Sequence, residues 1–349
     1  MSRRTTVGLV AVVVLALVAW LGWRLLTPDD PLARALRMAP AETSRAAWTD
    51  WEGVRRELGA EVDADSSAVE VDELLAEAFD RDLSPMSALG TSAGVMQEEL
   101  GFSPATLTWE LLAQGPGGAV EMMGVADDVD LDAIAERLVA LGWSEPEDEG
   151  GVWVGGPDVL ASVGPGLTPE LQHVALLADQ RVVLASDQAP YLEQVLAVVD
   201  GDDDGAEDLA ELAGTLEQPL AAAVYDGAYA CETLAMSQAD DAAQAEADQL
   251  VEAAGGVHPL TGFAMALLPD GDLRAVLQVE DADDAPADAD ARARLAAGPA
   301  PGQGGDFTER FSVERAGAEG REVVIDLRPV EGAYVLSDLT SGPVLFATC

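Results

Sequence analysis

The sequence predicts an α+β protein in which an N-terminal transmembrane helix precedes an ectodomain built on an antiparallel sheet. Two observations support this fold class. A long apolar stretch near the N-terminus has the length of a membrane span. Further along, two segments with strand-like alternation each contain a glycine turn and lead into a helical pattern. Hairpins that alternate with helices in this way are typical of α+β folds.

The predicted anchor covers residues 7–26, whose one charged residue, Arg24, can extend to the membrane surface. Arg3 and Arg4 precede it, so we expect residues 1–6 to be a cytoplasmic tail. The chain would then be a single-pass protein of the cell membrane with its C-terminal part outside the cytoplasm. A cleaved signal peptide is the alternative, although no small-residue cleavage site follows directly.

Two segments lead from the anchor to the first predicted strands. Residues 27–45 contain several prolines and predict a linker, and residues 46–103 predict a helical segment. Thr49 and Glu52 have the spacing of a capping box, in which a hydroxyl and a carboxylate satisfy free amides at a helix start. Apolar residues at helical spacing predict a further helix over 67–80.

The remaining chain divides into two predicted α+β halves, 104–216 and 217–349. Each begins with a strand, a glycine turn, a second strand and an acidic residue that starts a helix. Asp130 and Asp284 are these two acidic residues, and the units align at their offset of 154 residues. The alignment predicts a duplicated hairpin-plus-helix unit.

Four stretches of the predicted ectodomain are similar to segments of other proteins. They are GFSPATLTWELLAQG (Gly101–Gly115), LDAIAERLVALGW (Leu131–Trp143), GVWVGGPD (Gly151–Asp158) and LTPELQHVALL (Leu167–Leu177). They resemble a group of exported, singly anchored bacterial proteins that has no assigned activity. The resemblance covers residues 40–349. It implies the same topology and supplies no catalytic residues.

The charge of the chain excludes some classes of function, and its cysteines indicate a disulfide. The chain has 64 Asp and Glu against 18 basic residues, a net charge of -46, and all of the basic residues are Arg. Such a chain repels nucleic acid, and it lacks the lysine that Schiff-base enzymes need. Cys231 and Cys349 are its two cysteines. An oxidising compartment permits a disulfide between them, and two buried free thiols are the alternative.

An acidic loop matches the calcium-binding pattern of an EF-hand. Asp200, Asp202, Asp204 and Glu211 occupy ligand positions 1, 3, 5 and 12, and Gly205 permits the tight turn at position 6. No second loop of this kind is present in the sequence to pair with it. A solvated loop between two helices is therefore the alternative, and we otherwise expect no cofactor.

A second motif is the GxSxG pattern of serine hydrolases, with Ser92 at its centre. The residues before it do not predict a buried strand. His173 and His258 are poor candidates for its base, since one lies in an apolar run and the other beside a turn. A contact of small residues between helices is the alternative. Paired carboxylates could hydrolyse glycosides, but no spacing selects a pair.

The sequence thus predicts a non-catalytic, membrane-anchored extracytoplasmic protein of the bacterial envelope, which acts by binding or assembly. Its expected partners are the membrane, through residues 7–26, and an unknown envelope protein. A calcium-binding module at 200–211 and a serine hydrolase using Ser92 are the alternative functions.

Overall fold

The computed structural model describes residues 30–349. The predicted tail, 1–6, and the predicted anchor, 7–26, lie outside the described residues. Within 30–349, no helix combines the length and the apolar composition that crossing a membrane requires.

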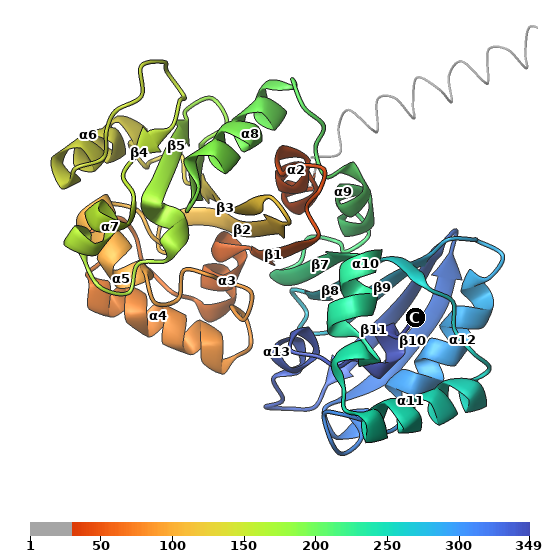
Figure 1. Cartoon of the computed structure of the whole chain (residues 1–349). Helices are drawn as coiled ribbons and strands as arrows, with labels where there is room; N and C mark the ends of the chain where they lie inside the picture. The colour runs from red at the N-terminus through yellow and green to blue at the C-terminus, as the bar shows by residue number, and fades with distance from the viewer. Residues whose placement is uncertain (1–29) are drawn as a thin grey trace, which may run out of the picture.

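The described residues form one sheet of eleven strands, and every neighbouring pair is antiparallel. The predicted α+β class with a large antiparallel sheet is therefore confirmed (Figure 1). The strands are β1 (Arg45–Thr49), β2 (Leu107–Gly115), β3 (Gly118–Val125), β4 (Trp153–Val154), β5 (His173–Leu177), β6 (Val182–Ser186), β7 (Ala221–Asp226), β8 (Leu260–Leu267), β9 (Leu273–Val279), β10 (Phe311–Glu319) and β11 (Glu322–Pro329).

The strand order repeats on the two sides of the sheet centre. It runs β10-β11-β9-β8-β7-β1-β2-β3-β6-β5-β4, so β1 and β7 form the central pair. Next to β1 lies the hairpin β2–β3, and beyond it lie β6 and β5, the second and first strands of the following hairpin. Next to β7 lies the hairpin β8–β9, and beyond it lie β11 and β10 in the same arrangement. Ala47 pairs with Ala223 at the centre, and three residues beyond each lies a helix cap, Asp50 or Asp226. Asp50 accepts from the N–H of Gly53, and Asp226 makes the equivalent bond.

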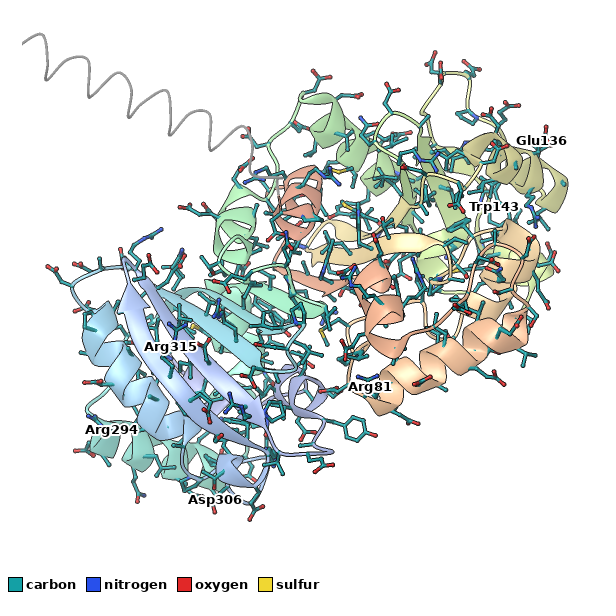
Figure 2. The ribbon with its side chains drawn as sticks, turned by 180° about the vertical axis from the view of Figure 1, so that it is seen from behind. Arg81, Glu136, Trp143, Arg294, Asp306 and Arg315 are labelled. Carbon is teal, nitrogen blue, oxygen red and sulfur yellow. A yellow bond between two sulfur atoms is a disulfide. The ribbon has the colours of Figure 1, made fainter. Side chains whose placement is uncertain are left out.

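Helices cover the two faces of this sheet unequally. The first face includes Met123, Ala223 and Met265, and the second face includes Trp48 and Leu111. The first face carries α3 (Trp51–Leu58), α4 (Ala68–Asp80), α5 (Ala93–Val95), α6 (Leu131–Leu141), α7 (Pro157–Val163), α10 (Gly227–Tyr229), α11 (Asp241–Ala254), α12 (Ala285–Ala296) and α13 (Val335–Thr340). The second face carries α2 (Pro31–Met38), α8 (Ala189–Asp200) and α9 (Glu207–Ala213). Charged side chains project from the outer surface of both halves (Figure 2).

Two sequence predictions differ from the structure near the start of the ectodomain. The segment 27–45, predicted as a linker, contains α2, because Leu32 and Leu36 pack into the core on the second face. The segment 46–103, predicted as helical, begins inside β1. Thr49 ends this strand and is not the predicted cap, because its main chain lies in the ladder between β2 and β7.

Candidate functional site

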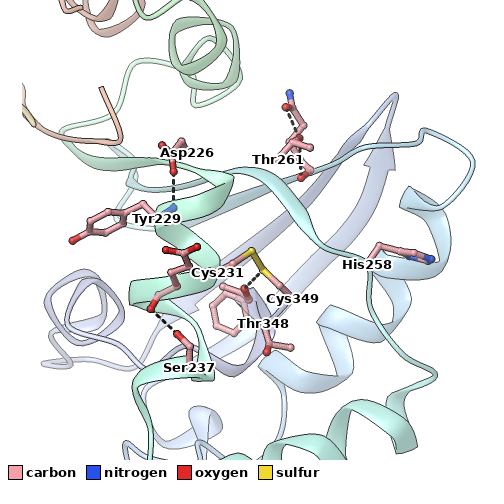
Figure 3. Close-up of a disulfide and its surroundings, with 12 residues drawn as sticks. Asp226, Tyr229, Cys231, Ser237, His258, Thr261, Thr348 and Cys349 are labelled. Carbon is pink, nitrogen blue, oxygen red and sulfur yellow. Dashed lines mark hydrogen bonds between the residues drawn. A yellow bond between two sulfur atoms is a disulfide. The ribbon is translucent and has the colours of Figure 1, made fainter. Parts of the chain in front are cut away.

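The two cysteines form a disulfide bond, which confirms the prediction from the sequence (Figure 3). Cys231 lies in a helical turn directly after α10, and Cys349 is the last residue of the sequence. Their Cα atoms are 5.6 Å apart, an ordinary distance for a disulfide. The buried Arg292 also holds the C-terminal segment, residues 346–349, because its guanidinium donates to the carbonyl oxygens of Phe346 and Thr348 at 2.8 and 2.9 Å.

Arg292 belongs to a cluster of charged groups beside the C-terminal segment. Its Nε donates to the buried carboxylate of Asp288 at 2.9 Å, and the ring of His258 bonds the same carboxylate at 2.6 Å. This hydrogen bond, aided by the nearby charges of Asp288 and Asp284, raises the pKa of His258. Since each group is paired with another, we interpret the cluster as a clamp on the C-terminal segment.

The four predicted calcium ligands are spread along one connection. Asp200 is the last residue of α8 and Glu211 lies within α9, while Asp202 and Asp204 lie in the exposed turn between them. Within the described part of the chain, no three His, Cys, Asp or Glu side chains gather in a group that could hold a metal ion. Calcium binding by this loop stays a prediction.

The serine of the GxSxG motif is buried and bonds to the main chain. Ser92 Oγ donates to the carbonyl of Gly166 at 3.1 Å and accepts from the N–H of Thr168 at 2.8 Å. His173 lies on β5 and His258 in the clamp described above, and neither bonds to this serine. The geometry is that of a hydroxyl that anchors a loop.

Two carboxyl groups lie wholly buried under the helices of the first half. Glu110 on β2 accepts from Trp51 Nε1 and Ser87 Oγ, both at 2.8 Å, and from the N–H of Ala88 at 2.6 Å. Burial raises the pKa of Glu110 to about 7 although these bonds oppose the rise. Glu121 on β3 has no hydrogen-bond partner among the described residues. Burial, and then the nearby Glu110, raises the pKa of Glu121 well above its ordinary value. Neither carboxyl reaches solvent, so we interpret the pair as a structural feature.

A cleft of about 380 Å³ lies over the centre of the sheet, where the two halves meet. Its floor comes from first-face residues of the three central strands, and these are Arg45, Ala47, Gln114, Ala223 and Tyr225. Ala47 and Ala223 face each other across the β1–β7 ladder. Because both side chains are single methyl groups, they leave space above the centre of the sheet.

Side chains from the segment 46–103 and from the second half, 217–349, form the walls of this cleft. Met86 comes from the loop after α4, and Tyr229 and Leu234 come from the helical turns after β7. Thr340 and Ser341, at the end of α13, add hydroxyl groups at the rim. The cleft thus combines apolar walls with a few polar groups, as small-molecule sites do.

Arg45 is the one charged residue among those that line the cleft. Its Nη1 donates to the hydroxyl of Tyr229 at 2.7 Å, and its guanidinium carbon lies 5.4 Å from the centre of that ring. Tyr225 stacks on Tyr229 with ring centres 5.5 Å apart. Burial raises the pKa of Tyr225 above its ordinary value, so its phenol stays neutral. A cation therefore lies beside two stacked aromatic rings.

Sequence reasoning did not identify these residues. The available signals were faint: Arg45 precedes a short apolar run, and Tyr225 and Tyr229 are two of only four tyrosines in the chain. Nothing local indicates that they meet, because they do so only when β1 pairs with β7.

Comparisons with known proteins add no functional information. No protein-family model and no curated protein sequence matches this chain. Among solved structures, crystal form I of TP0453 is similar over 92% of this chain and 99% of that chain, with 10% sequence identity and a TM-score of 0.40. Crystal form III of TP0453 is similar over 88% of this chain and 97% of that chain, with 9% identity and a TM-score of 0.43. At such scores the likeness carries no argument about this chain.

Proposed function

We propose that this chain is a non-catalytic binding protein of the bacterial envelope, anchored in the cell membrane by residues 7–26. The apolar composition of that stretch, and Arg3 and Arg4 before it, support an anchor with the α+β part outside the cytoplasm. The Cys231–Cys349 disulfide supports the same location, because such bonds persist in oxidising compartments. Protease added to whole cells should degrade the α+β part, and its survival in cells with an intact membrane would contradict this location.

The cleft over the centre of the sheet is the observation that carries the proposed binding function. Its volume of about 380 Å³ lies in the range of small-molecule sites. Both halves contribute residues to it, so a ligand there would contact strands on both sides of the sheet centre. The buried environments of Ser92 and of Glu110 and Glu121 favour a binding role over a hydrolytic one. An envelope protein that receives or delivers this ligand is the partner we expect.

We also infer that the two halves arose by duplication. The repeated strand order outward from β1 and β7 supports this inference. So do the matching caps Asp50 and Asp226, each of which accepts from the N–H three residues later. A third support is the offset of 154 residues, which also relates the starts of α6, Leu131, and α12, Ala285.

Filling the cleft tests the binding function. The full chain in lipid nanodiscs is titrated by calorimetry with two probes of the same shape, 2-naphthoate and the uncharged 2-naphthamide. Ala47→Trp places an indole on the partly exposed floor, and Thr233→Trp places one at the exposed rim. Ala316→Trp makes the same change on an exposed strand outside the cleft and is the matched control.

We expect at least one probe to bind the wild type with one-to-one stoichiometry. Ala47→Trp and Thr233→Trp should weaken that binding at least tenfold, and Ala316→Trp should leave it unchanged. Thr233→Trp covers the case in which Ala47→Trp fails to fold, which circular dichroism reveals. If neither probe binds, or if the rim variant binds as well as the wild type, the proposed binding site is wrong.

A further inference from the structure

We propose that the cleft selects an anion, a carboxylate or a phosphate ester carried on a planar apolar body, and that Arg45 binds the anionic group. This inference rests on the proposed binding function and names the class of ligand for the same site.

The first support is the absence of carboxylates from the cleft. Asp and Glu make up 64 of the 349 residues, so twelve residues chosen at random would include about two of them. The twelve lining residues include none. Four other cavities on the described part of the chain each include at least one Asp or Glu. The lining of the cleft therefore carries one positive charge on a strongly acidic molecule, and an anion would meet less repulsion there than in the other cavities.

The second support is the bonding state of Arg45. Among the partly buried arginines of residues 30–349, it is the one whose guanidinium meets neither a carboxylate nor a main-chain carbonyl. Arg55 and Arg181, for example, donate to carbonyl oxygens, and Arg274 pairs with carboxylates. A guanidinium has five N–H donors, and among the described residues that of Arg45 makes one donation, to Tyr229. The remaining donors suit the two-point geometry of a carboxylate or phosphate.

The third support is that the guanidinium is already oriented. The hydroxyl of Tyr229 accepts from Nη1, and the ring of Tyr229 is fixed by stacking on the buried ring of Tyr225. An arginine held in this way loses little side-chain freedom when an anion binds, which favours affinity. The neutral phenol of the buried Tyr225 leaves the positive charge of Arg45 available to the ligand.

The walls indicate what carries the anion. Met86 offers partly exposed apolar surface, and the methyl group of Ala47 forms the partly exposed floor over the central strands, where it faces the buried Ala223. A flat apolar body can lie between this floor and these walls, and the hydroxyl oxygens of Thr340 and Ser341, whose protons already bond main-chain carbonyls, can still accept from polar substituents. A highly hydrated, compact anion would leave this apolar surface unused.

The two probes separate this inference from the binding function itself. In the wild type, 2-naphthoate should bind at least about tenfold more tightly than 2-naphthamide, the difference expected for hydrogen bonds to a charged group. Arg45→Gln should remove this preference, and Arg45→Lys should restore only part of it, because an ammonium lacks the fork of a guanidinium. Arg321→Gln removes the same charge from an exposed position without a side-chain partner and should leave the preference unchanged. Titration with 2-naphthyl phosphate shows which of the two anionic groups is preferred.

The outcomes are distinct. If 2-naphthamide binds as tightly as 2-naphthoate, the anion inference is overturned while the binding function stands. If Arg45→Gln keeps the full preference, another group binds the anion and the assignment to Arg45 is wrong. If neither uncharged nor charged probe binds the wild type, the binding function itself fails. Melting of Arg45→Gln by circular dichroism should match the wild type, which excludes misfolding as the cause of a lost preference.

Discussion

Glu121→Gln replaces a fully buried carboxyl with an uncharged side chain of the same shape. Burial raises the pKa of Glu121 well above its ordinary value of 4.5, so the folded chain keeps this carboxyl protonated at pH values where the unfolded chain has already lost the proton. The unfolded chain ionises it near the ordinary value. The folded state of the wild type then binds one proton more than the unfolded state. Its free energy of unfolding therefore falls as the pH rises above 4.5 towards the raised pKa.

The size of this fall follows from the proton balance. One such proton changes the free energy of unfolding by about 1.4 kcal/mol per pH unit, and by about 2.5 kcal/mol between pH 5 and pH 7 when the onset of ionisation is included. Glutamine does not ionise and lacks this contribution. We expect the free energy of unfolding of Glu121→Gln to rise relative to the wild type over that interval, and about 2.5 kcal/mol is the upper limit for one proton. Any constant cost of its unpaired amide shifts the whole curve and leaves the slope unchanged.

Urea denaturation followed by circular dichroism at pH 5, 6 and 7 measures this slope. The control is Glu136→Gln, which makes the same change on the exposed side of α6 (Figure 2). The control corrects for the general repulsion in a chain of charge -46 and should follow the wild type at every pH. If Glu121→Gln also runs parallel to the wild type, the Glu121 carboxyl is ionised in the folded state and the account of its burial is wrong.

Three further changes probe the packing of the molecule, each measured by urea denaturation. Cys231→Ser removes the disulfide across 118 residues and should cost about 5 kcal/mol on the loop-entropy model, whereas a loss below 1 kcal/mol would contradict that model. Arg292→Met removes the buried guanidinium from the Asp288 carboxylate, which keeps only its bonds to His258, and should cost about 3–5 kcal/mol; an unchanged stability would show that the clamp is not formed. Gly124→Ala brings a methyl group within 2.2 Å of the Trp109 indole and should cost about 1–3 kcal/mol. Gly317→Ala meets no atom within 4 Å and should be neutral, and equal effects of the two alanines would refute this reasoning.

Features that depend on neighbouring residues could be predicted from the sequence. The first half is predicted to begin with a strand, a glycine turn and a second strand, and β2 and β3 form this hairpin at Leu107–Gly115 and Gly118–Val125. Its glycine turn and alternating pattern are local signals. The disulfide was predictable for another reason, because a chain with two cysteines offers a single pairing.

Features that depend on distant pairing could not be predicted in this way. β1 is five residues long and lies buried between strands from both halves, so neither length nor alternation marks it. The acidic residues that follow it resemble a helix start, and Asp50 does cap α3, which drew the predicted helix one residue too far back. Since β1 was missed, the place where Arg45 meets Tyr229 could not be found.

The position of the cleft follows from the arrangement of the two halves. β1 and β7 lie at the centre of the sheet, between the outer strands of its two sides, and the cleft lies over them. Alanines at the centre of both strands leave the uncovered space unfilled. A ligand bound there would contact strands and helices from both halves at once, so its binding energy would oppose any separation of one half from the other. An anion at Arg45 is therefore expected to stabilise the whole sheet, rather than one half of it, against unfolding.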